Sequence, residues 1–186
     1  AKPLFKLAEE YPDIELDLSF SDRFVDVVGE AFDLVVRIGT LADSSLIARR
    51  VGSTWLRVCA SPGYLEAHGR PNKPADLLSH ECLLYAQETS SSAWQFSGGE
   101  TVNVRGRIRS DSGDAHHTAA LDGMGIARLP DFFVSDDVAE GRLVTLLDEY
   151  EAEPIGIWVL YPHRRHLSLK VRLAVDRLSE ALEACS

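Results

Sequence analysis

The sequence has few cysteines and no long apolar run. Its uncharged apolar stretch at 155–161 is far shorter than the roughly 20 residues that span a membrane, and nothing at its N-terminus has the pattern of a secretion signal. Cys59, Cys82 and Cys185 lack the close spacing of zinc and redox motifs. We therefore expect a cytoplasmic chain with reduced thiols and with no disulfide, metal or cofactor.

Positive charge is also scarce. The sequence has 19 Lys and Arg residues but 29 Asp and Glu residues, which gives a formal net charge of −10. Nucleic-acid binding depends on clustered cations that displace counterions from phosphates, so this chain is not expected to bind DNA or RNA by itself. The sequence also lacks a P-loop, a GxGxxG loop, an HExxH pattern and a nucleophile elbow. With 45% hydrophobic residues in 186, it is long enough to bury a sizeable core.

The order of apolar patterns predicts an α/β fold. Residues 14–20 alternate as in a strand, 22–31 carry a helical stripe after the capping pair Ser21 and Asp22, and 33–38 form an apolar run that ends at Gly39. A second β-α-β pattern follows later in the chain, over 108–130. Such repeats favour two lobes, each with a mostly parallel sheet flanked by helices.

The remaining patterns extend this scheme. A helix is expected before Pro12, and because it precedes the first strand, we expect the natural N-terminus to lie outside this chain. The stretch 46–61 is β-rich with a break at Gly52, and Gly98 and Gly99 suggest a hairpin turn. Further strands are predicted at 82–85, 94–96, 102–109, 143–147 and 155–161, and further helices at 131–140 and 167–182.

Several short segments, in this order, resemble the effector-binding domain of LysR-type transcriptional regulators. They include YPDIEL, DRFVDVV, FDLVVRIG and ASPGYL in the first third, then HECL, AALDGMGIARLP and GRLV; these segments occupy 11–16, 22–28, 32–39, 60–65, 80–83, 119–130 and 141–144. The resemblance spans essentially the whole chain.

The resemblance implies a type II periplasmic-binding-protein-like fold with a small-molecule inducer in an interlobe cleft. Lobe I would comprise 1–57 and 157–186, and lobe II 58–156, with crossings near Arg57 and Ile157. Family members also carry a winged helix-turn-helix, a linker helix and usually a first strand, all absent from this sequence. DNA binding is then expected only through the missing N-terminal domain. The oligomer is expected to be a homodimer, or a tetramer at full length.

In open α/β sheets, ligands bind outside the carboxyl ends of the strands, near helix N-termini. Those positions, with the family pattern at Ser21 and at the loop Leu129–Pro130, give our candidate effector-binding residues: Ser21, Asp22, Arg37, Gly39, Thr40, Ser112, Arg128, Leu129 and Pro130. Arg37 and Arg128 interrupt apolar runs, one in each lobe. Together they would clamp a carboxylate or phosphate; alternatively, each pairs with a carboxylate such as Asp22, Asp33 or Asp131.

Other interpretations stay open. A transport-type solute-binding protein would share the two-lobed plan. An enzyme of the cleft would need a catalytic constellation, and His116 with His117 forms a poor metal site because adjacent helix positions point about 100° apart. Apolar residues at 22–31 and 46–56 belong either to a lobe core or to a homodimer contact.

Overall fold

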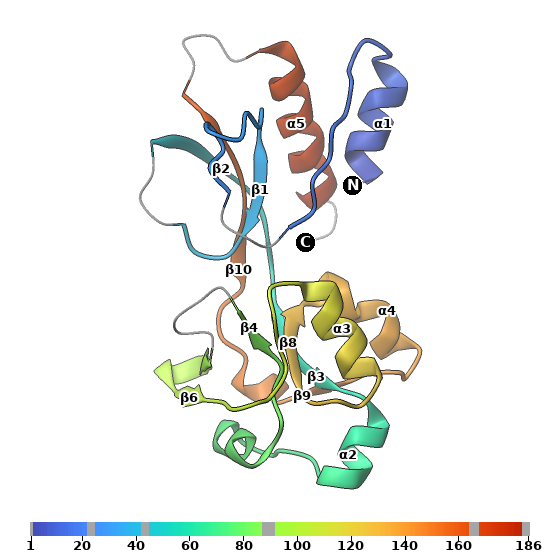
Figure 1. Cartoon of the computed structure of the whole chain (residues 1–186), viewed down its shortest axis with the longest axis vertical. Helices are drawn as coiled ribbons and strands as arrows, with labels where there is room; N and C mark the ends of the chain where they lie inside the picture. Colours follow the sequence, from blue (N-terminus) through green and yellow to red (C-terminus); the bar gives the residue numbers. More distant parts are fainter. Residues whose placement is uncertain (1, 22–24, 42–44, 87–91, 164–167, 184–186) are drawn as a thin grey trace. The chain divides into compact units, whose positions relative to one another are not determined.

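The computed structural model describes residues 2–21, 25–41, 45–86, 92–163 and 168–183. The chain divides into two compact units (Figure 1). Unit 1 comprises Ala1–Phe20, Phe24–Thr54 and Ile155–Ser186, and unit 2 comprises Ser21–Arg23 and Trp55–Pro154. No helix among the described residues is long and apolar enough to cross a membrane.

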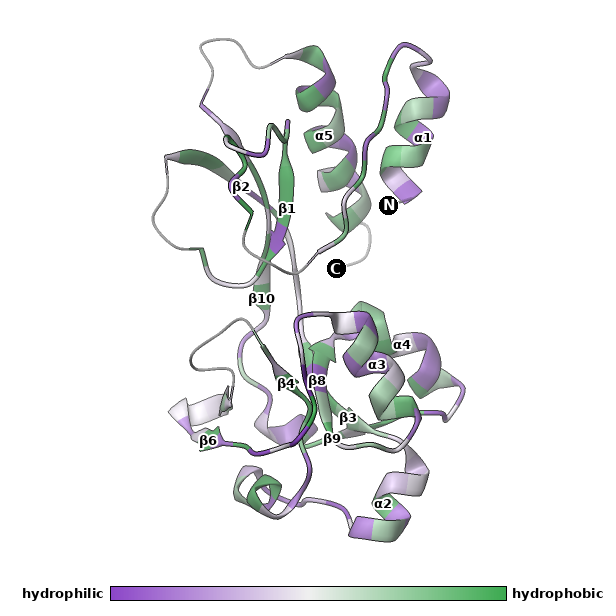
Figure 2. Ribbon diagram, viewed as in Figure 1, coloured by the Kyte–Doolittle hydropathy of each residue, from purple (hydrophilic) through white to green (hydrophobic). Residues whose placement is uncertain are grey.

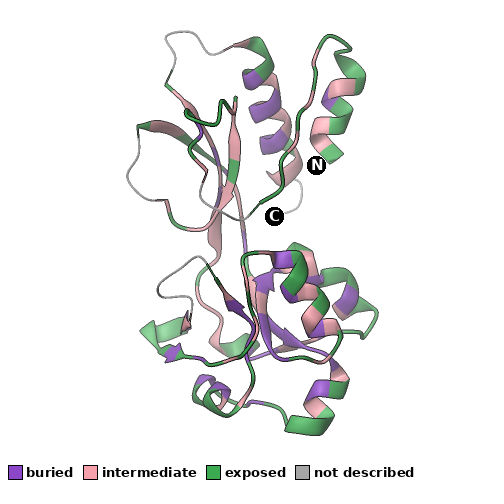
Figure 3. Ribbon diagram, viewed as in Figure 1, coloured by how far each residue is buried: buried purple, intermediate pink, exposed green. Residues whose placement is uncertain are grey.

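Unit 1 is built on a three-stranded sheet in the order β1-β10-β2. The strands are β1 (Val35–Ile38), β2 (Leu46–Thr54) and β10 (Ile155–Pro162), and β10 runs antiparallel to both neighbours. Helix α5 (Leu169–Glu183) packs its buried side on this sheet, and α1 (Lys2–Glu10) contacts α5 (Figure 3). The core gathers β-branched residues of the sheet and α5: Val51, Ile157, Val159, Val171, Val175 and, beside them, Leu178.

The first predicted β-α-β pattern is wrong in two of its three elements. Residues 14–20 show the expected alternation, with Ile14, Leu16 and Leu18 half-buried, but no strand is assigned over them. Among the described residues of the predicted helix, 27–30 form only a turn. A strand needs a paired neighbour, and β10 is the only strand that pairs with β1 in the described part of the chain.

The helix fails because a side chain competes for its backbone. The Asp26 carboxylate accepts hydrogen bonds from the amides of Val28 at 3.1 Å and Gly29 at 3.0 Å. Such local side-chain bonds favour a turn over a continuing helix. Ala31 then has a left-handed backbone, with φ of 59°, which ends the segment.

Unit 2 contains a mixed sheet. Strand β3 (Leu56–Ala60) lies between β8 (Ala127–Pro130) and β9 (Val144–Leu146), antiparallel to both. On the far side of β8, a parallel bridge joins Cys82 to Ile126, and β4 (Leu84–Tyr85) pairs in parallel with β7 (Arg109–Ser110). Helices α3 (Gly113–Leu121) and α4 (Asp131–Ala139) contact this sheet, and α2 (Pro62–His68) follows β3.

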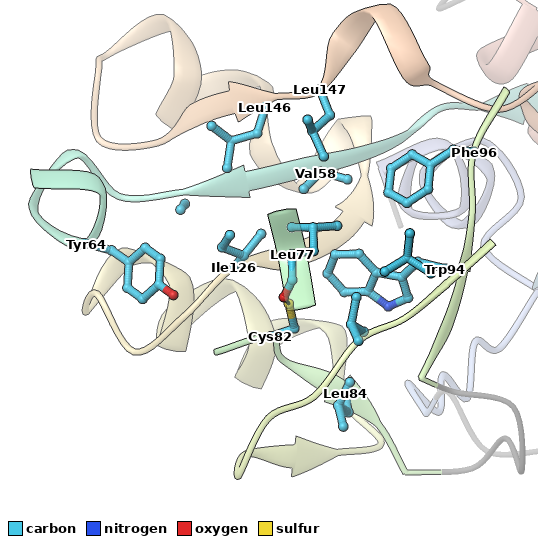
Figure 4. Close-up of a cluster of buried hydrophobic side chains, with 13 residues drawn as sticks. Val58, Tyr64, Leu77, Cys82, Leu84, Trp94, Phe96, Ile126, Leu146 and Leu147 are labelled. Atoms are coloured by element: carbon cyan, nitrogen blue, oxygen red, sulfur yellow. Dashed lines mark hydrogen bonds between the residues drawn. The ribbon is translucent and has the colours of Figure 1, made fainter. Parts of the chain in front are cut away.

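The two faces of the β3–β8–β9 sheet bury different cores. Val58, Ile126 and Leu146 join one cluster with Trp94 and Phe96, shown in Figure 4. The alternate residues of the same strands face α3 and α4, in a second cluster that contains Cys59, Ala120, Ala127, Leu129, Val134 and Leu143. Figures 2 and 3 show that these strands are mostly apolar and largely buried, as expected for a sheet covered on both faces.

The hairpin of β5 (Ala93–Gln95) and β6 (Thr101–Asn103) closes the first cluster. Its turn holds Gly98 and Gly99, both with positive φ, which confirms the predicted glycine turn. A methyl group on Gly106, downstream of β6, would lie 1.7 Å from the carbonyl oxygen of Cys82. This close backbone approach explains why the position carries glycine.

The α/β class is confirmed, but the prediction of mostly parallel ladders is wrong for both three-stranded sheets. β1 and β2 run in the same direction, as do β8 and β9, yet β10 and β3 lie between them and run the opposite way. β3 opens the long stretch of unit 2, and β10 begins where the chain returns to unit 1. Helix α4 joins β8 to β9 and is the kind of crossover that strands of the same direction require, whereas β3 lies between these two strands as an antiparallel partner of both.

Candidate functional site

One edge of unit 2 collects the ends of three strands. Three strands, β7, β4 and β8, run in the same direction. This follows because β4 pairs in parallel with β7, and the Cys82–Ile126 bridge between the segments before β4 and β8 is also parallel. Their carboxyl ends, at Ser110, Tyr85 and Pro130, therefore lie at the same edge of the sheet, where ligands of α/β folds bind. The structure thus brings Ser112 and the segment from Arg128 to Pro130 to one side of unit 2.

Ser112 begins helix α3 at this edge. Its hydroxyl accepts a long hydrogen bond of 3.4 Å from the Ala115 amide, and its own amide donates to the Ser110 hydroxyl at 3.2 Å. Ser112 is therefore an N-cap residue, which fixes the path from β7 into α3. Asp114 places a carboxylate in the first turn of the same helix.

Arg128 is the predicted residue with the most unusual environment. It lies opposite Val58 in the β3–β8 ladder, and its guanidinium carbon is 5.9 Å from the centre of the Phe96 ring. Burial lowers the pKa of Arg128 below its ordinary value. Among the described residues, no carboxylate forms an ion pair with it. The alternative pairing with Asp131 is not observed, because Asp131 binds Arg57.

Leu129 and Pro130 are placed differently from a ligand-contacting loop. Leu129 is completely buried in the core beneath α3 and α4. Pro130 is buried too, and it is the residue from which α4 begins. Leu129 fixes the end of β8 by packing, and Pro130 fixes the start of α4.

The candidates of unit 1 lie at the end of β1. Arg37 is half-buried opposite Trp158, and it already has an interaction partner. Gly39 has φ of 119°; its amide donates to the carbonyl of Gly156 at 2.9 Å, and its carbonyl accepts from the Trp158 indole at 3.1 Å. Thr40 is exposed beside this turn.

The remaining two candidates lie upstream of β1. Ser21 is exposed and has an interaction partner, and Asp22 lies outside the described residues.

Sequence reasoning missed an ion-pair cluster around Arg57. Its Nε donates to Asp131 Oδ1 at 2.6 Å, and its Nη1 lies 2.6 Å from both carboxylate oxygens of Glu151. Burial works against the charge of Arg57, but the hydrogen bonds to both acids outweigh it and raise the pKa of Arg57. The signal was present, since Arg57 interrupts an apolar strand just as Arg128 does.

Sequence reasoning also missed Tyr85 and a pocket. The Tyr85 ring meets the buried His116 ring edge-on, with centroids 4.4 Å apart, beside the start of α3. A pocket of about 430 Å³ lies between the β5–β6 turn and the segment after Tyr150, lined by Gln95, Phe96, Ser97, Gly98, Gly99, Thr101, Glu151, Ala152 and Glu153. None of the predicted site residues lines it, because hairpin turns of this kind carry no ligand signature.

The two histidines of α3 and two of the three cysteines pack within unit 2. His116 Nε2 lies 3.1 Å from the Leu84 carbonyl oxygen, and His117 Nε2 lies 2.6 Å from Asp137. Cys59 and Cys82 are free and buried, and burial raises the pKa of each thiol to about 12. Cys185 lies outside the described residues.

The sequence matches the family described as LysR substrate binding domain over residues 4–183. This chain belongs to that family. The resemblance drawn from short segments is thereby confirmed, together with the two-lobed type II fold that it implied.

Relatives of this LysR domain are transcriptional regulators. The HTH-type transcriptional regulator DmlR of Escherichia coli is 36% identical over 184 residues, covering 97% of this chain and 60% of DmlR. An uncharacterized HTH-type regulator of Haemophilus influenzae is 36% identical over 165 residues, covering 87% of this chain and 57% of that protein. This chain therefore spans less than two thirds of the length of these relatives.

Solved structures agree with this assignment. The regulatory domain of CrgA, a LysR-type regulator from Neisseria meningitidis, superposes with a TM-score of 0.87 at 32% identity, covering 97% of this chain and 90% of that one. Full-length AphB, a virulence activator from Vibrio cholerae, gives a TM-score of 0.80 at 32% identity, covering 97% of this chain and 62% of that one. The LysR domain thus matches the regulatory part of longer proteins.

Proposed function

We propose that this LysR domain senses a small organic anion, and that Arg128 binds the anion's charge. The observation that carries this proposal is the environment of Arg128: a guanidinium partly removed from water, against Phe96, with no acid partner among the described residues. A desolvated cation is costly unless an opposite charge accompanies it. A bound carboxylate or phosphate would supply that charge, with two parallel hydrogen bonds to the planar group.

The proposed switch needs only two arrangements of the domain with different affinities for the anion. The effector then shifts their populations, and the change passes to a DNA-binding region outside this chain, in a cytoplasmic regulator. We infer no catalytic role, since the relatives are regulators. The solute-binding alternative is not retained for the same reason.

Thermal unfolding of this chain against a compound panel tests the proposal. The panel contains small organic acids, amino acids, phenols and sugar phosphates, and is run on wild type, Arg128→Ala and Arg37→Ala. A ligand at 100 times its Kd stabilises by about 2.7 kcal/mol, which raises the midpoint by several degrees. We expect one anion class to shift the wild type and to lose its effect in Arg128→Ala.

Arg49→Ala is the control, because Arg49 forms an exposed pair with Asp176 in unit 1. It should keep the full ligand shift. An anion that shifts Arg128→Ala as much as the wild type would contradict the role of Arg128, and a panel in which only uncharged compounds act would contradict the anionic effector.

We also propose that the domain forms a homodimer, since most soluble oligomers are symmetric homo-oligomers with twofold dimers the commonest. Sedimentation at micromolar concentration should then give twice the 20.5 kDa mass of the chain. A single species of 20.5 kDa would contradict a dimer made by this domain alone.

A further inference from the structure

Arg57 joins two segments that are far apart in the sequence. Asp131, which it binds through Nε, is the first residue of α4 and directly follows Pro130. Glu151, which it binds through Nη1, directly follows the short helix η3 (Asp148–Tyr150). The Glu151 side chain is only 13% exposed and Arg57 is 27% exposed, so both charges are largely removed from water. Charge-assisted bonds of this length and burial hold their partners in one geometry.

Both ends of the long stretch of unit 2 lie within a few residues of this cluster in the sequence. The long stretch of unit 2 begins at Trp55 and ends at Pro154. Arg57 lies two residues after Trp55, the first residue of this stretch, and Glu151 lies three residues before Pro154, its last residue. In addition, the Asp131 amide donates to the Trp55 carbonyl at 2.9 Å, and the Arg57 guanidinium carbon lies 5.8 Å from the centre of the Trp55 ring.

The same cluster adjoins the proposed anion-binding residue. Arg57 pairs with Leu129 and Val58 pairs with Arg128, so the two arginines occupy neighbouring rungs of one ladder. Because side chains alternate along a strand, they point to opposite faces of the sheet. In the chain, Arg128 lies three residues before Asp131. A shift of the end of β8, which carries Arg128, therefore also moves Asp131, the acid that Arg57 holds.

We propose that Arg57 is a positioning residue of the effector site: it ties the junction of β8 and α4 to the segments at the two ends of the long stretch of unit 2, near Trp55 and near Glu151. The inference rests on the proposed function for its meaning, since the junction includes Arg128. Arg57 does not touch the effector. It holds Asp131 and Glu151 so that the end of β8 has one position, and it makes that position depend on the two end segments of this stretch.

Lysine is the informative replacement. Arg57→Lys keeps the charge, but its compact ammonium group lacks the planar fork that reaches both acids at once. The matched control is Arg142→Lys, because Arg142 also bridges two carboxylates of unit 2, Asp137 and Glu140, at the other end of α4.

The first measurement is amide hydrogen exchange of the ligand-free chain by NMR. The Asp131 amide reports on the junction, and the amides of Leu83 and Ile126, which are hydrogen bonded at 2.8 Å within the sheet, report on the rest of unit 2. We expect Arg57→Lys to speed exchange at Asp131 by about tenfold while the two reference amides change much less. Arg142→Lys should leave Asp131 unchanged. Equal exchange at Asp131 in wild type and Arg57→Lys, or an equal rise at all three amides, would overturn the proposal.

The second measurement is calorimetric titration with malonate, a small dicarboxylate, as the probe. We expect the malonate Kd of Arg57→Lys to rise about tenfold at a temperature where the variant remains folded, and that of Arg142→Lys to stay at the wild-type value. An unchanged Kd in Arg57→Lys would overturn the proposal. Failure of the wild type to bind malonate would count against this anion as effector, and the exchange result would then decide whether Arg57 positions the junction.

Discussion

Arg57 and Arg128 lie on neighbouring rungs of the same strand pair, and both sit about 6 Å from the centre of an aromatic ring. Their surroundings otherwise differ. Arg57 binds two carboxylates, which raise its pKa although burial opposes this, whereas burial alone lowers the pKa of Arg128. An arginine that interrupts an apolar strand is therefore partly buried in both cases, but the carboxylates around it decide whether its charge is paired within the described part of the fold.

The largest expected effect is that of removing the Arg57 charge. Arg57→Met leaves Glu151, whose side chain is 13% exposed, and the more exposed Asp131 without their cation, so we expect a loss of about 2 kcal/mol in the free energy of unfolding, less than for fully buried pairs. Urea unfolding monitored by circular dichroism measures it. Arg49→Met, which breaks the exposed pair with Asp176, is the control and should change stability by less than about 0.5 kcal/mol. Equal losses in the two variants would show that the partly buried ion pairs of Arg57 contribute no more to stability than the exposed pair of Arg49.

Asp137 extends the comparison to a third arginine. Its buried carboxylate lies 2.5 Å from Arg142 Nε and 2.6 Å from His117 Nε2. The hydrogen bond from Arg142 is the main reason that the pKa of Asp137 is lowered, with a smaller contribution from His117, while burial opposes both. We expect Asp137→Asn to cost about 1 to 2 kcal/mol near neutral pH.

The pH dependence of this cost has a definite sign. Because the folded pKa of Asp137 is lowered, its stabilisation is complete above the ordinary carboxyl pKa and is lost as the pH falls below about 4. Unfolding curves of wild type and Asp137→Asn should therefore converge on acidification. A gap that stays constant down to pH 3 would show that the carboxylate charge contributes nothing.

Arg128→Met should have a smaller effect on stability. Methionine has a similar length, and it removes a desolvated charge that has no acid partner among the described residues, so we expect a change within about 1 kcal/mol in either direction. Thermal and urea unfolding without ligand measure it. A loss as large as that of Arg57→Met would indicate that Arg128 is a structural residue, contrary to the proposed anion site.

The smallest effect is expected for Glu140→Gln. Glu140 is the second acid bound to Arg142, but its side chain is 58% exposed, against 8% for Asp137. Exposed pairs contribute little because water screens them, so the change should stay below about 0.5 kcal/mol. The comparison with Asp137→Asn separates the burial of the acid from the mere presence of an ion pair, and a larger loss in Glu140→Gln would reverse that conclusion.

Much of unit 2 could be predicted from local patterns. The α4 helix, the Gly98–Gly99 turn and the strand β9 lie where periodicity and glycine placed them. In unit 1, the same reasoning failed for 14–31. The alternation there was correct, but a strand also needs a neighbour, and the Asp26 carboxylate diverted the backbone from a helix into a turn.

The candidate site shows the same limit. Sequence patterns located Ser112 and Arg128 near strand ends, and the parallel β4–β7 pair and the Cys82–Ile126 bridge bring those ends to one edge. The patterns did not distinguish Leu129, whose side chain is fully buried, from a ligand-contacting residue. They also could not separate Arg57 from Arg128, because alternation tells which face a side chain takes but not which charges meet it there.

The sequence by itself determined the α/β class, the family, most helices and the position of Arg128 in an apolar strand, because these follow from local periodicity and from short segments in a fixed order. Only the tertiary structure decided the strand directions and the partners of each arginine. β3 and β10 run against their neighbours, and Asp131 and Glu151 reach Arg57 from 74 and 94 residues away. Contacts over such separations depend on the packed fold, which no local pattern encodes.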